Sequence, residues 1–376
     1  MLWIFLAILL VSIVIGLPIA FGLGVAALVM AVLSDIPLSI MIEQSIRGVN
    51  SFPLLAIPFF ILVGEVMSNG GIARRLMELA GALVGFMRGG LGQVAITGSM
   101  FFGGISGSAV ADTAATGSMM IPSMKQQGYT AANATAINTV SSVIGIIIPP
   151  SIPLILYGVS TDTSIGQLFL AGIGPGILIG MALIIFLYLF CKVRGYGKDD
   201  YKDSTGFMIS LKRAWVALLM PVVVIGGIYG GIFTPTEASA VAVFFALIVG
   251  AFYYRELKLA DLGPILRQSV ISTAAVMLII ASAALFSFLL SRTGLPAQIA
   301  TLVTNTIESP MMFLLVVNAL LLIVGMFIET SAAILVLAPI LTPIAIQFGI
   351  HPVHFGLVMV VNLALGMITP PLGVNF

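Results

Sequence analysis

A run of small residues, Phe102-Gly103-Gly104-Ile105-Ser106-Gly107-Ser108-Ala109, interrupts an apolar segment that covers residues 91–124. A second run, Gly325-Met326-Phe327-Ile328-Glu329-Thr330-Ser331-Ala332, interrupts the apolar segment 310–348 in the same way. Each half of these segments has about 15 to 20 residues, enough for a membrane-embedded helix. The pattern predicts two re-entrant helical hairpins whose tips reach toward the middle of a membrane. Non-helical backbone is tolerated there only against protein or a water-filled cavity.

The composition of the whole chain agrees with a membrane protein. Of its 376 residues, 60% are hydrophobic and 8% are charged, whereas a soluble chain is about 25% charged. A transmembrane barrel would need short alternating segments, which are absent, and the single Cys191 allows no disulfide framework. The net charge of +1 argues against nucleic acid as a partner. We therefore expect an all-α polytopic membrane protein, with further apolar segments near 1–16, 18–34, 52–68, 130–160, 165–192, 214–231, 235–254, 262–290 and from 353 onward.

The distribution of basic residues predicts the orientation in the membrane. If both hairpins enter and leave on one side, all of the 15 Lys and Arg residues except Arg47 and Arg292 lie on the same side. The positive-inside rule makes that side the cytoplasm. The N-terminus is then expected in the periplasm.

An internal repeat organises the chain. Gly325 lies 221 positions after Gly104, and the same offset places Pro343 on Pro122, Gly366 on Gly145 and Pro370-Pro371 on Pro149-Pro150. We expect a first repeat at 1–194, a cytoplasmic linker at 195–212 and a second repeat at 213–376. The predicted orientation starts the first repeat outside and the second inside, so the repeats are inverted. Inverted repeats are typical of secondary transporters whose binding site lies near the midplane.

Each predicted repeat also contains an amphipathic segment before its hairpin. Residues 72–86 and 295–307 both carry apolar side chains on one helical face and polar side chains on the other. They are interpreted as arm helices lying on the membrane surface. Ordinary loop helices would give the same pattern, but the matched positions favour a framing role.

A proline pair follows each hairpin within an apolar span. Proline removes a backbone donor and frees carbonyl groups upstream, so Gly145 to Ser151 and Gly366 to Pro371 are predicted breaks in spanning helices. A simple kink is the alternative. Asn138 and Ser142 precede the first break at a spacing that puts them on one helical face.

The tips and the breaks supply the candidate site residues. Backbone carbonyls, hydroxyls and intramembrane acids suit Na+, and helix N-termini suit a carboxylate. Packing of small residues, or internal bracing of the hairpin by Asp112, would also explain part of the pattern. The predicted Na+ ligands are Ser106, Ser108, Asp112, Asn138, Ser142, Gly145, Gly325, Glu329, Thr330, Gly366 and Thr369. The predicted substrate-binding residues are Ser106, Gly107, Ser108, Pro150, Ser151, Thr330, Ser331 and Pro371.

Four motifs in this order resemble the large membrane subunit of the tripartite ATP-independent periplasmic (TRAP) transporters over nearly the whole chain. They are Gly103 to Asp112, Ile148-Pro149-Pro150-Ser151, Gly230 to Ala238 and Gly366 to Asn375. The resemblance implies Na+-driven uptake of an organic anion, such as a C4-dicarboxylate or a sugar acid, by an elevator-type transport domain moving against a scaffold. It also implies a periplasmic substrate-binding protein, a small four-helix membrane subunit, surrounding membrane lipid and a bacterial or archaeal cytoplasmic (inner) membrane. Family members continue through a further spanning helix, so the second repeat is expected to be C-terminally incomplete.

Three other functions differ from this interpretation in what they would require of the chain. A stand-alone Na+/dicarboxylate symporter could share the inverted repeat, and it would need no binding protein. A channel fits the composition, but paired inverted hairpins favour alternating access. An enzyme is not expected, because the sequence has neither a Gly-x-Ser-x-Gly nor a His-Glu-x-x-His motif.

Overall fold

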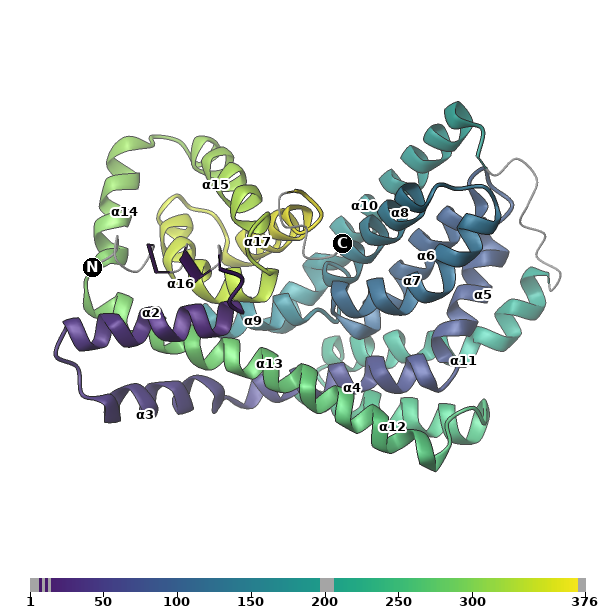
Figure 1. Ribbon diagram of the computed structural model, residues 1–376, viewed down its shortest axis with the longest axis horizontal. Helices are drawn as coiled ribbons and strands as arrows, with labels where there is room; N and C mark the ends of the chain where they lie inside the picture. Colours follow the sequence, from purple (N-terminus) through teal and green to yellow (C-terminus); the bar gives the residue numbers. More distant parts are fainter. Residues whose placement is uncertain (1–6, 9–10, 13–14, 197–205, 371–376) are drawn as a thin grey trace. The chain divides into compact units, whose positions relative to one another are not determined.

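The structure is a computed structural model that describes residues 7–8, 11–12, 15–196 and 206–370, with only the backbone described at 104–106 and 295. Within these residues all regular secondary structure is helical (Figure 1). The α-helices are α2 (Ile19–Leu33), α3 (Leu38–Val49), α4 (Ala56–Asn69), α5 (Ile72–Val84), α6 (Gly90–Ser106), α7 (Ala109–Gln126), α8 (Ala131–Val143), α9 (Ile152–Ser160), α10 (Ile165–Arg194), α11 (Phe207–Tyr229), α12 (Pro235–Ile248), α13 (Leu259–Arg292), α14 (Leu295–Thr306), α15 (Pro310–Gly325), α16 (Thr330–Gln347) and α17 (Pro352–Gly366). Two 3-10 turns, η1 (Phe52–Leu55) and η2 (Ile144–Ile146), and a π-helical turn, η3 (Val249–Tyr253), complete them.

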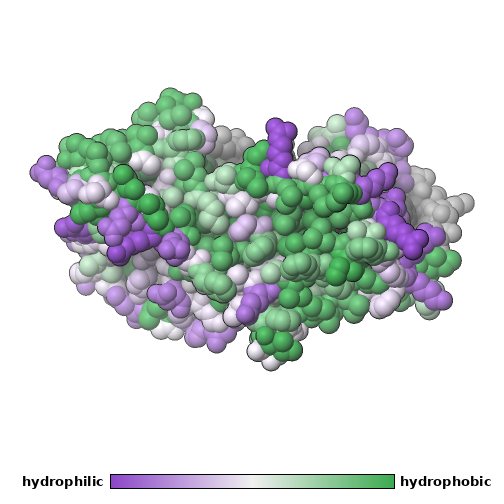
Figure 2. Space-filling view, turned by 90° about the horizontal axis from the view of Figure 1, so that it is seen from below, coloured by the Kyte–Doolittle hydropathy of each residue, from purple (hydrophilic) through white to green (hydrophobic). Residues whose placement is uncertain are grey.

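Many of these helices have the length and composition of membrane spans. Six segments in the described part of the chain qualify, namely Phe52–Asn69, Ile165–Arg194, Phe207–Tyr229, Pro235–Tyr253, Leu259–Arg292 and Thr330–Gln347. Apolar side chains cover much of the surface drawn in Figure 2, as expected where lipid replaces water as the solvent. The predicted all-α membrane class is confirmed.

The chain divides into two compact units. The first-hairpin unit consists of Ala56–Leu154 and Ile165–Val270 and contains the hairpin α6–α7. The second-hairpin unit contains the residues up to Leu55, Ile155–Ser164 and those from Ile271 to the end of the described chain, including the hairpin α15–α16. Helices α9 and α13 each run from one unit into the other.

The core of the first-hairpin unit forms around α6. Leu91, Val94 and Ala95 of α6 are at most 5% exposed, and α6 contacts α5, α7, α8 and α10 (Figure 1). A helix surrounded on all sides is apolar all round, which explains why its sequence shows no single apolar stripe. The other core side chains are Met77, Ala80, Ile96, Met120, Met124, Tyr129, Ala134, Ile144, Leu187 and Cys191.

Aromatic side chains organise the second-hairpin unit. Phe313 of α15 stacks on Phe348 and Phe355, with ring centroids 4.9 and 6.0 Å apart. The fully buried Tyr157 of α9 donates its hydroxyl to the Pro352 carbonyl (2.8 Å) and accepts from Thr342 of α16 (3.1 Å). These contacts join α9 to the second hairpin and to α17.

Each unit contains the same succession of arm helix, hairpin and broken helix. Ser108 is the N-cap of α7 and Glu329 is the N-cap of α16, and these two residues are 221 positions apart, like the other repeated residues. The loops after the hairpins also correspond, because Gly128 and Gly349 both adopt positive φ angles, of 87° and 73°. Part of the predicted linker, residues 207–212, belongs to α11, and residues 197–205 lie outside the described chain. The repeat boundaries themselves stay a prediction.

Candidate functional site

The tip of the first hairpin is a tight turn between α6 and α7. Helix α6 ends at Ser106, Gly107 takes a left-handed conformation (φ +61°), and Ser108 begins α7 by accepting a hydrogen bond from the Ala111 N–H (3.4 Å). The Ser106 side chain lies outside the described part of the structure. The hydroxyl of Ser108 therefore contributes to the fold as a helix cap.

The same tip touches the first helix break. The Gly107 carbonyl accepts from the Ile152 N–H (3.3 Å), and a β-carbon at Gly107 would lie 2.9 Å from the Pro150 carbonyl oxygen. Ser151 is fully buried, donates its hydroxyl to the Ile146 carbonyl (2.5 Å) and accepts from the Leu154 N–H (3.4 Å). The Pro149–Pro150 peptide bond is cis. The sequence-predicted residues Gly107, Ser108, Pro150 and Ser151 thus lie together at this tip.

Two glycines allow the hairpin and the broken helix to cross closely. A β-carbon at Gly145 would lie 2.8 Å from the Gly103 α-carbon, and one at Gly103 would overlap Gly145. Any larger side chain would push the two backbones apart. The crossing brings the backbone of η2 against the last turns of α6.

Asp112 lies beside this crossing with its carboxyl group unused. The residue is fully buried, and neither carboxyl oxygen has a hydrogen-bond partner among the side chains and backbone that the structure describes. A β-carbon at Gly145 would lie 3.5 Å from Asp112 Oδ2, so this oxygen faces the break. The Ser99 hydroxyl of α6 lies near the same carboxyl group and is buried, with no hydrogen-bond partner among the described residues. A buried carboxylate without a partner is expensive, so this group requires a cation or a proton.

Asn138 and Ser142 attach the broken helix to the hairpin. The Asn138 side-chain amide donates to the Thr113 carbonyl (3.0 Å), and its oxygen accepts from the Thr116 hydroxyl (2.9 Å). The Ser142 and Thr113 hydroxyls are hydrogen-bonded to each other (2.5 Å). Asn138 and Ser142 therefore hold α8 against α7 just behind Asp112. The sequence interpretation missed Thr113, Thr116 and Ser99, although Ser99 lies one helical turn before Gly103 on the same face.

The tip of the second hairpin uses its acid differently. Glu329 is the N-cap of α16, and its carboxylate accepts from the Ser331 N–H (2.9 Å), the Ser331 hydroxyl (2.8 Å) and the Ala332 N–H (3.2 Å). The buried Thr330 hydroxyl donates to the Met367 sulfur (2.7 Å). The polar groups of this tip are largely satisfied by one another.

A second pair of glycines repeats the close crossing. A β-carbon at Gly325 would lie 2.9 Å from the Gly366 α-carbon, and one at Gly366 would lie 2.5 Å from the Gly325 α-carbon. The Thr369 hydroxyl donates to the Leu365 carbonyl (2.9 Å) just after this break. Pro371, a predicted substrate-binding residue, lies outside the described residues.

The polar atoms that can coordinate a cation at both crossings are oxygens. Within the described part of the chain no three His, Cys, Asp or Glu side chains are grouped to hold a metal ion. Carboxylate, carbonyl and hydroxyl oxygens suit hard cations, whereas transition metals prefer imidazole and thiolate ligands. The N-termini of α7 and α16, which begin at the tips, can stabilise an anion.

Comparison with known proteins places this architecture in a family. Residues 6–376 match the family described as tripartite ATP-independent periplasmic transporter, DctM component. The chain belongs to this family. The resemblance seen in the sequence motifs is therefore confirmed.

Several relatives in this TRAP family are similar over most of the chain. The C4-dicarboxylate TRAP transporter large permease protein of Pseudomonas aeruginosa is 45% identical over 86% of this chain and 76% of its own length. The sialic acid large permease protein of Vibrio cholerae is 41% identical over 95% of this chain and 84% of its own. The isethionate permease protein DctMQ of Oleidesulfovibrio alaskensis is 44% identical, and the chain spans 57% of its length. These relatives are transporter permeases, so the chain is a transporter component and not an enzyme.

A solved structure shows the same fold. The YdaH transporter of Alcanivorax borkumensis, described as having an unusual topology, superimposes with a TM-score of 0.60 at 17% sequence identity. The match covers 90% of this chain and 80% of that one. At this identity the likeness concerns the fold alone.

Proposed function

We propose that this large TRAP permease takes up an organic anion by Na+-coupled symport, driven by a Na+ gradient. The anion is delivered by a periplasmic binding protein, and the chain works beside a small four-helix membrane subunit in the cytoplasmic (inner) membrane. The N-terminus is periplasmic in this proposal. The hairpins and broken helices form an elevator-type transport domain that moves against the remaining helices.

One observation carries the Na+ part of the proposal. The buried Asp112 carboxylate has no hydrogen-bond partner in the described part of the chain, and it faces Gly145 and Ser99 beside a helix break. A Na+ ion there would neutralise the carboxylate and would be coordinated by the Ser99 hydroxyl and by the backbone carbonyls near Gly145. Ser106, Ser108, Asn138 and Ser142 complete the proposed surroundings, the last two by positioning α8.

A second Na+ site is proposed at the second tip. Carbonyl groups near Gly325 and Gly366, with Glu329, Thr330 and Thr369, would supply its oxygens. Because the Glu329 carboxylate already accepts three hydrogen bonds, we expect this site to bind Na+ more weakly than the first.

The substrate is proposed from the relatives and from the helix ends at the tips. The relatives are named for C4-dicarboxylate, sialic acid, isethionate and 2,3-diketo-L-gulonate, all of which are organic anions. A helix N-terminus compensates the negative charge of an anion, and α7 and α16 each begin at a hairpin tip, the second beside the Ser331 hydroxyl. We propose a carboxylate such as a C4-dicarboxylate or a sugar acid.

Uptake into liposomes tests the proposal. The chain is reconstituted with its small subunit and the cognate binding protein, and radiolabelled candidate anions are supplied with an inward Na+ gradient or an equal K+ gradient. Accumulation should require both Na+ and the binding protein. Uptake that proceeds equally in K+ would overturn the Na+ assignment, and uptake without the binding protein would favour a stand-alone symporter.

A further inference from the structure

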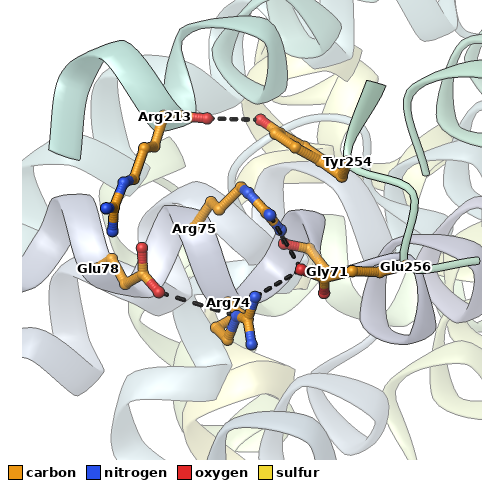
Figure 3. Close-up of polar contacts among 7 residues, drawn as sticks. All are labelled: Gly71, Arg74, Arg75, Glu78, Arg213, Tyr254 and Glu256. Atoms are coloured by element: carbon orange, nitrogen blue, oxygen red, sulfur yellow. Dashed lines mark hydrogen bonds and ion pairs between the residues drawn. The ribbon is translucent and has the colours of Figure 1, made fainter. Parts of the chain in front are cut away.

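A short segment between η3 and α13 holds the first arm helix in the first-hairpin unit. The Glu256 carboxylate pairs with Arg74 (2.5 Å) and Arg75 (2.9 Å), which lie in the first turn of α5 (Figure 3). The Arg75 guanidinium also stacks over the Tyr254 ring, 3.7 Å from its centroid. Basic residues at a helix N-terminus are unfavourable, so Glu256 stabilises a turn that has no side-chain cap of its own. Tyr254 and Glu256, with their two arginine partners, are called the arm clamp below.

Tyr254 links the arm clamp to α11. Its hydroxyl donates to the Arg213 carbonyl (2.8 Å), and Figure 3 shows the Arg213 side chain directed toward Glu78. Burial raises the pKa of Tyr254 to about 12, so the phenol remains a neutral donor at physiological pH. Around Tyr254, the side chains of Arg74, Arg75 and Arg213 thus each lie toward the carboxylate of Glu78 or Glu256.

The residues that flank this segment in η3 and α13, together with Trp215 of α11, are exposed. The Trp215 indole N–H donates to the Tyr253 hydroxyl (3.1 Å), and these two side chains are 49% and 51% exposed. Phe252 and Leu259 beside them are 75% and 86% exposed. Tryptophan and tyrosine with exposed apolar neighbours are typical of the boundary between lipid tails and headgroups.

Three basic residues lie within five positions of this aromatic pair in the sequence, and within the described chain none has a carboxylate partner. Lys212, Arg255 and Lys258 are exposed, and none forms an ion pair within the described chain. Arg255 donates to the Phe252 carbonyl (3.4 Å). The nearby acid Asp261 accepts from the Lys258 backbone N–H (2.9 Å) and so caps the start of α13. Counting Asp261, the surface keeps an excess of positive charge next to apolar side chains.

We propose that Lys212, Trp215, Tyr253, Arg255 and Lys258 form a binding site for the headgroup of an anionic phospholipid. The basic side chains meet the phosphate, the aromatic pair lies at the depth of the glycerol backbone, and Phe252 and Leu259 contact the acyl chains. The side of the membrane agrees, because these basic residues belong to the predicted cytoplasmic set and the cytoplasmic leaflet carries anionic lipid. A soluble anion would gain nothing from the exposed apolar neighbours.

The site adjoins the arm clamp through the backbone. Tyr253 and Arg255 of the proposed lipid site alternate in sequence with Tyr254 and Glu256 of the arm clamp, and the Tyr253 and Tyr254 rings contact each other edge-on with centroids 5.0 Å apart. A bound headgroup would restrain residues 253–258 and thereby the N-terminus of α5. On the transport mechanism proposed above, anionic lipid is then expected to stabilise the arm and to increase the rate of uptake.

Native mass spectrometry of the purified complex tests the site without relying on transport. The complex is titrated with phosphatidylglycerol or phosphatidylethanolamine, using wild type, a Lys212→Gln/Arg255→Gln/Lys258→Gln variant and an Arg88→Gln/Lys125→Gln/Lys192→Gln control. The control removes the same charge from three other basic residues of the predicted cytoplasmic side. We expect the site variant to bind phosphatidylglycerol at least tenfold more weakly, with phosphatidylethanolamine binding unchanged in every protein.

Two further variants separate charge from folding and from aromatic contact. A Lys212→Arg/Arg255→Lys/Lys258→Arg variant keeps the charge and should bind like wild type, whereas Trp215→Leu should weaken binding severalfold. Equal loss in the site variant and the control would mean nonspecific attraction and would overturn the proposal. Unchanged lipid binding with loss of the small subunit would assign the surface to that subunit instead. If lipid binding follows the prediction but uptake is independent of Na+, the lipid site stands and the transport proposal fails.

Discussion

The two hairpin tips share a backbone plan but place their negative charge differently. Ser108 and Glu329 occupy matched positions and both cap the second helix of their hairpin. The first tip carries its acid one turn later, at Asp112, where both carboxyl oxygens lack a hydrogen-bond partner within the described residues. The second tip has Ala333 at that position, and its acid is the cap itself, bound by three donors.

This difference shows how a repeated fold can divide two tasks. A carboxylate that accepts hydrogen bonds from backbone N–H groups stabilises the start of the helix. Because its negative charge is already stabilised, it gains little from binding a cation. A buried carboxylate without donors destabilises the empty protein and gains most from a bound ion. The first tip is therefore expected to be the stronger Na+ site.

The largest effect is expected from Asp112→Asn. This substitution removes the charge that a bound Na+ would neutralise, so Na+ affinity should fall by more than about a hundredfold, which corresponds to about 3 kcal/mol. Without Na+ the variant should be at least as stable as wild type, because a buried charge is gone. Thermal unfolding of the purified protein over a Na+ series measures both effects.

Glu329→Gln is the matched control for that experiment. It removes the corresponding charge at the second tip. We expect the apparent Na+ affinity, obtained from the Na+-dependent shift of the melting temperature, to change by no more than about threefold. If Glu329→Gln abolishes Na+ binding and Asp112→Asn does not, the assignment of the stronger site is reversed.

The next largest effect is expected at the glycine crossings. A methyl group at Gly103 would overlap the Gly145 backbone, and one at Gly325 would lie 2.9 Å from the Gly366 α-carbon. Gly103→Ala should cost about 2–3 kcal/mol of unfolding free energy and Gly325→Ala slightly less. Gly226→Ala is the control, because a β-carbon at Gly226 in helix α11 would meet open space, and it should stabilise the protein by about 0.5–1 kcal/mol. Chemical denaturation in detergent measures the unfolding free energy of all three variants. If both crossing variants are as stable as wild type, the close backbone packing at the glycines does not contribute to stability.

Much of this fold could be predicted because its signals are local. The proline pairs, the glycine-rich tips and the amphipathic pattern of residues 72–86 each interrupt or mark a long apolar run. The structure confirms the hairpins α6–α7 and α15–α16 and the helix α5. The short amphipathic helix α3 was not predicted, because Glu43 and Arg47 make residues 38–49 resemble a polar loop.

The site was harder to predict, because the use of a side chain depends on neighbours distant in sequence. Asp112 and Glu329 look alike as intramembrane acids, yet one has no donors and the other has three. Ser151 was a candidate for binding substrate, but its hydroxyl is engaged within the helix break. The arm clamp joins residues about 180 positions apart, and no local pattern reveals it.

A smaller effect is expected from the asparagines that attach the broken helices. Asn138 bonds α8 to the hairpin helix after the tip, whereas Asn362 bonds α17 to Asn318 on the helix before the tip (2.5 Å). Each Asn→Ala substitution should cost about 1–2 kcal/mol of unfolding free energy. Only Asn138→Ala should also weaken Na+ binding, by about tenfold, because it releases the backbone behind Asp112. Equal losses of Na+ affinity in both variants would contradict the assignment of the stronger Na+ site to the first tip.

The smallest effect is expected at the cap of the first hairpin, where Ser108→Ala should cost about 1 kcal/mol of unfolding free energy. Thr130→Ala removes a similar cap from α8, since the Thr130 side chain accepts from the Asn133 N–H, and should cost about the same. The two variants separate the structural role of Ser108 from a role as a Na+ ligand, because only the Ser108 hydroxyl lies at the tip. We expect Ser108→Ala to weaken Na+ binding severalfold and Thr130→Ala to leave it unchanged. Equal Na+ affinities in the two variants would reduce Ser108 to a cap, and the cation at Asp112 would then depend on Ser99 and on the carbonyls near Gly145 alone.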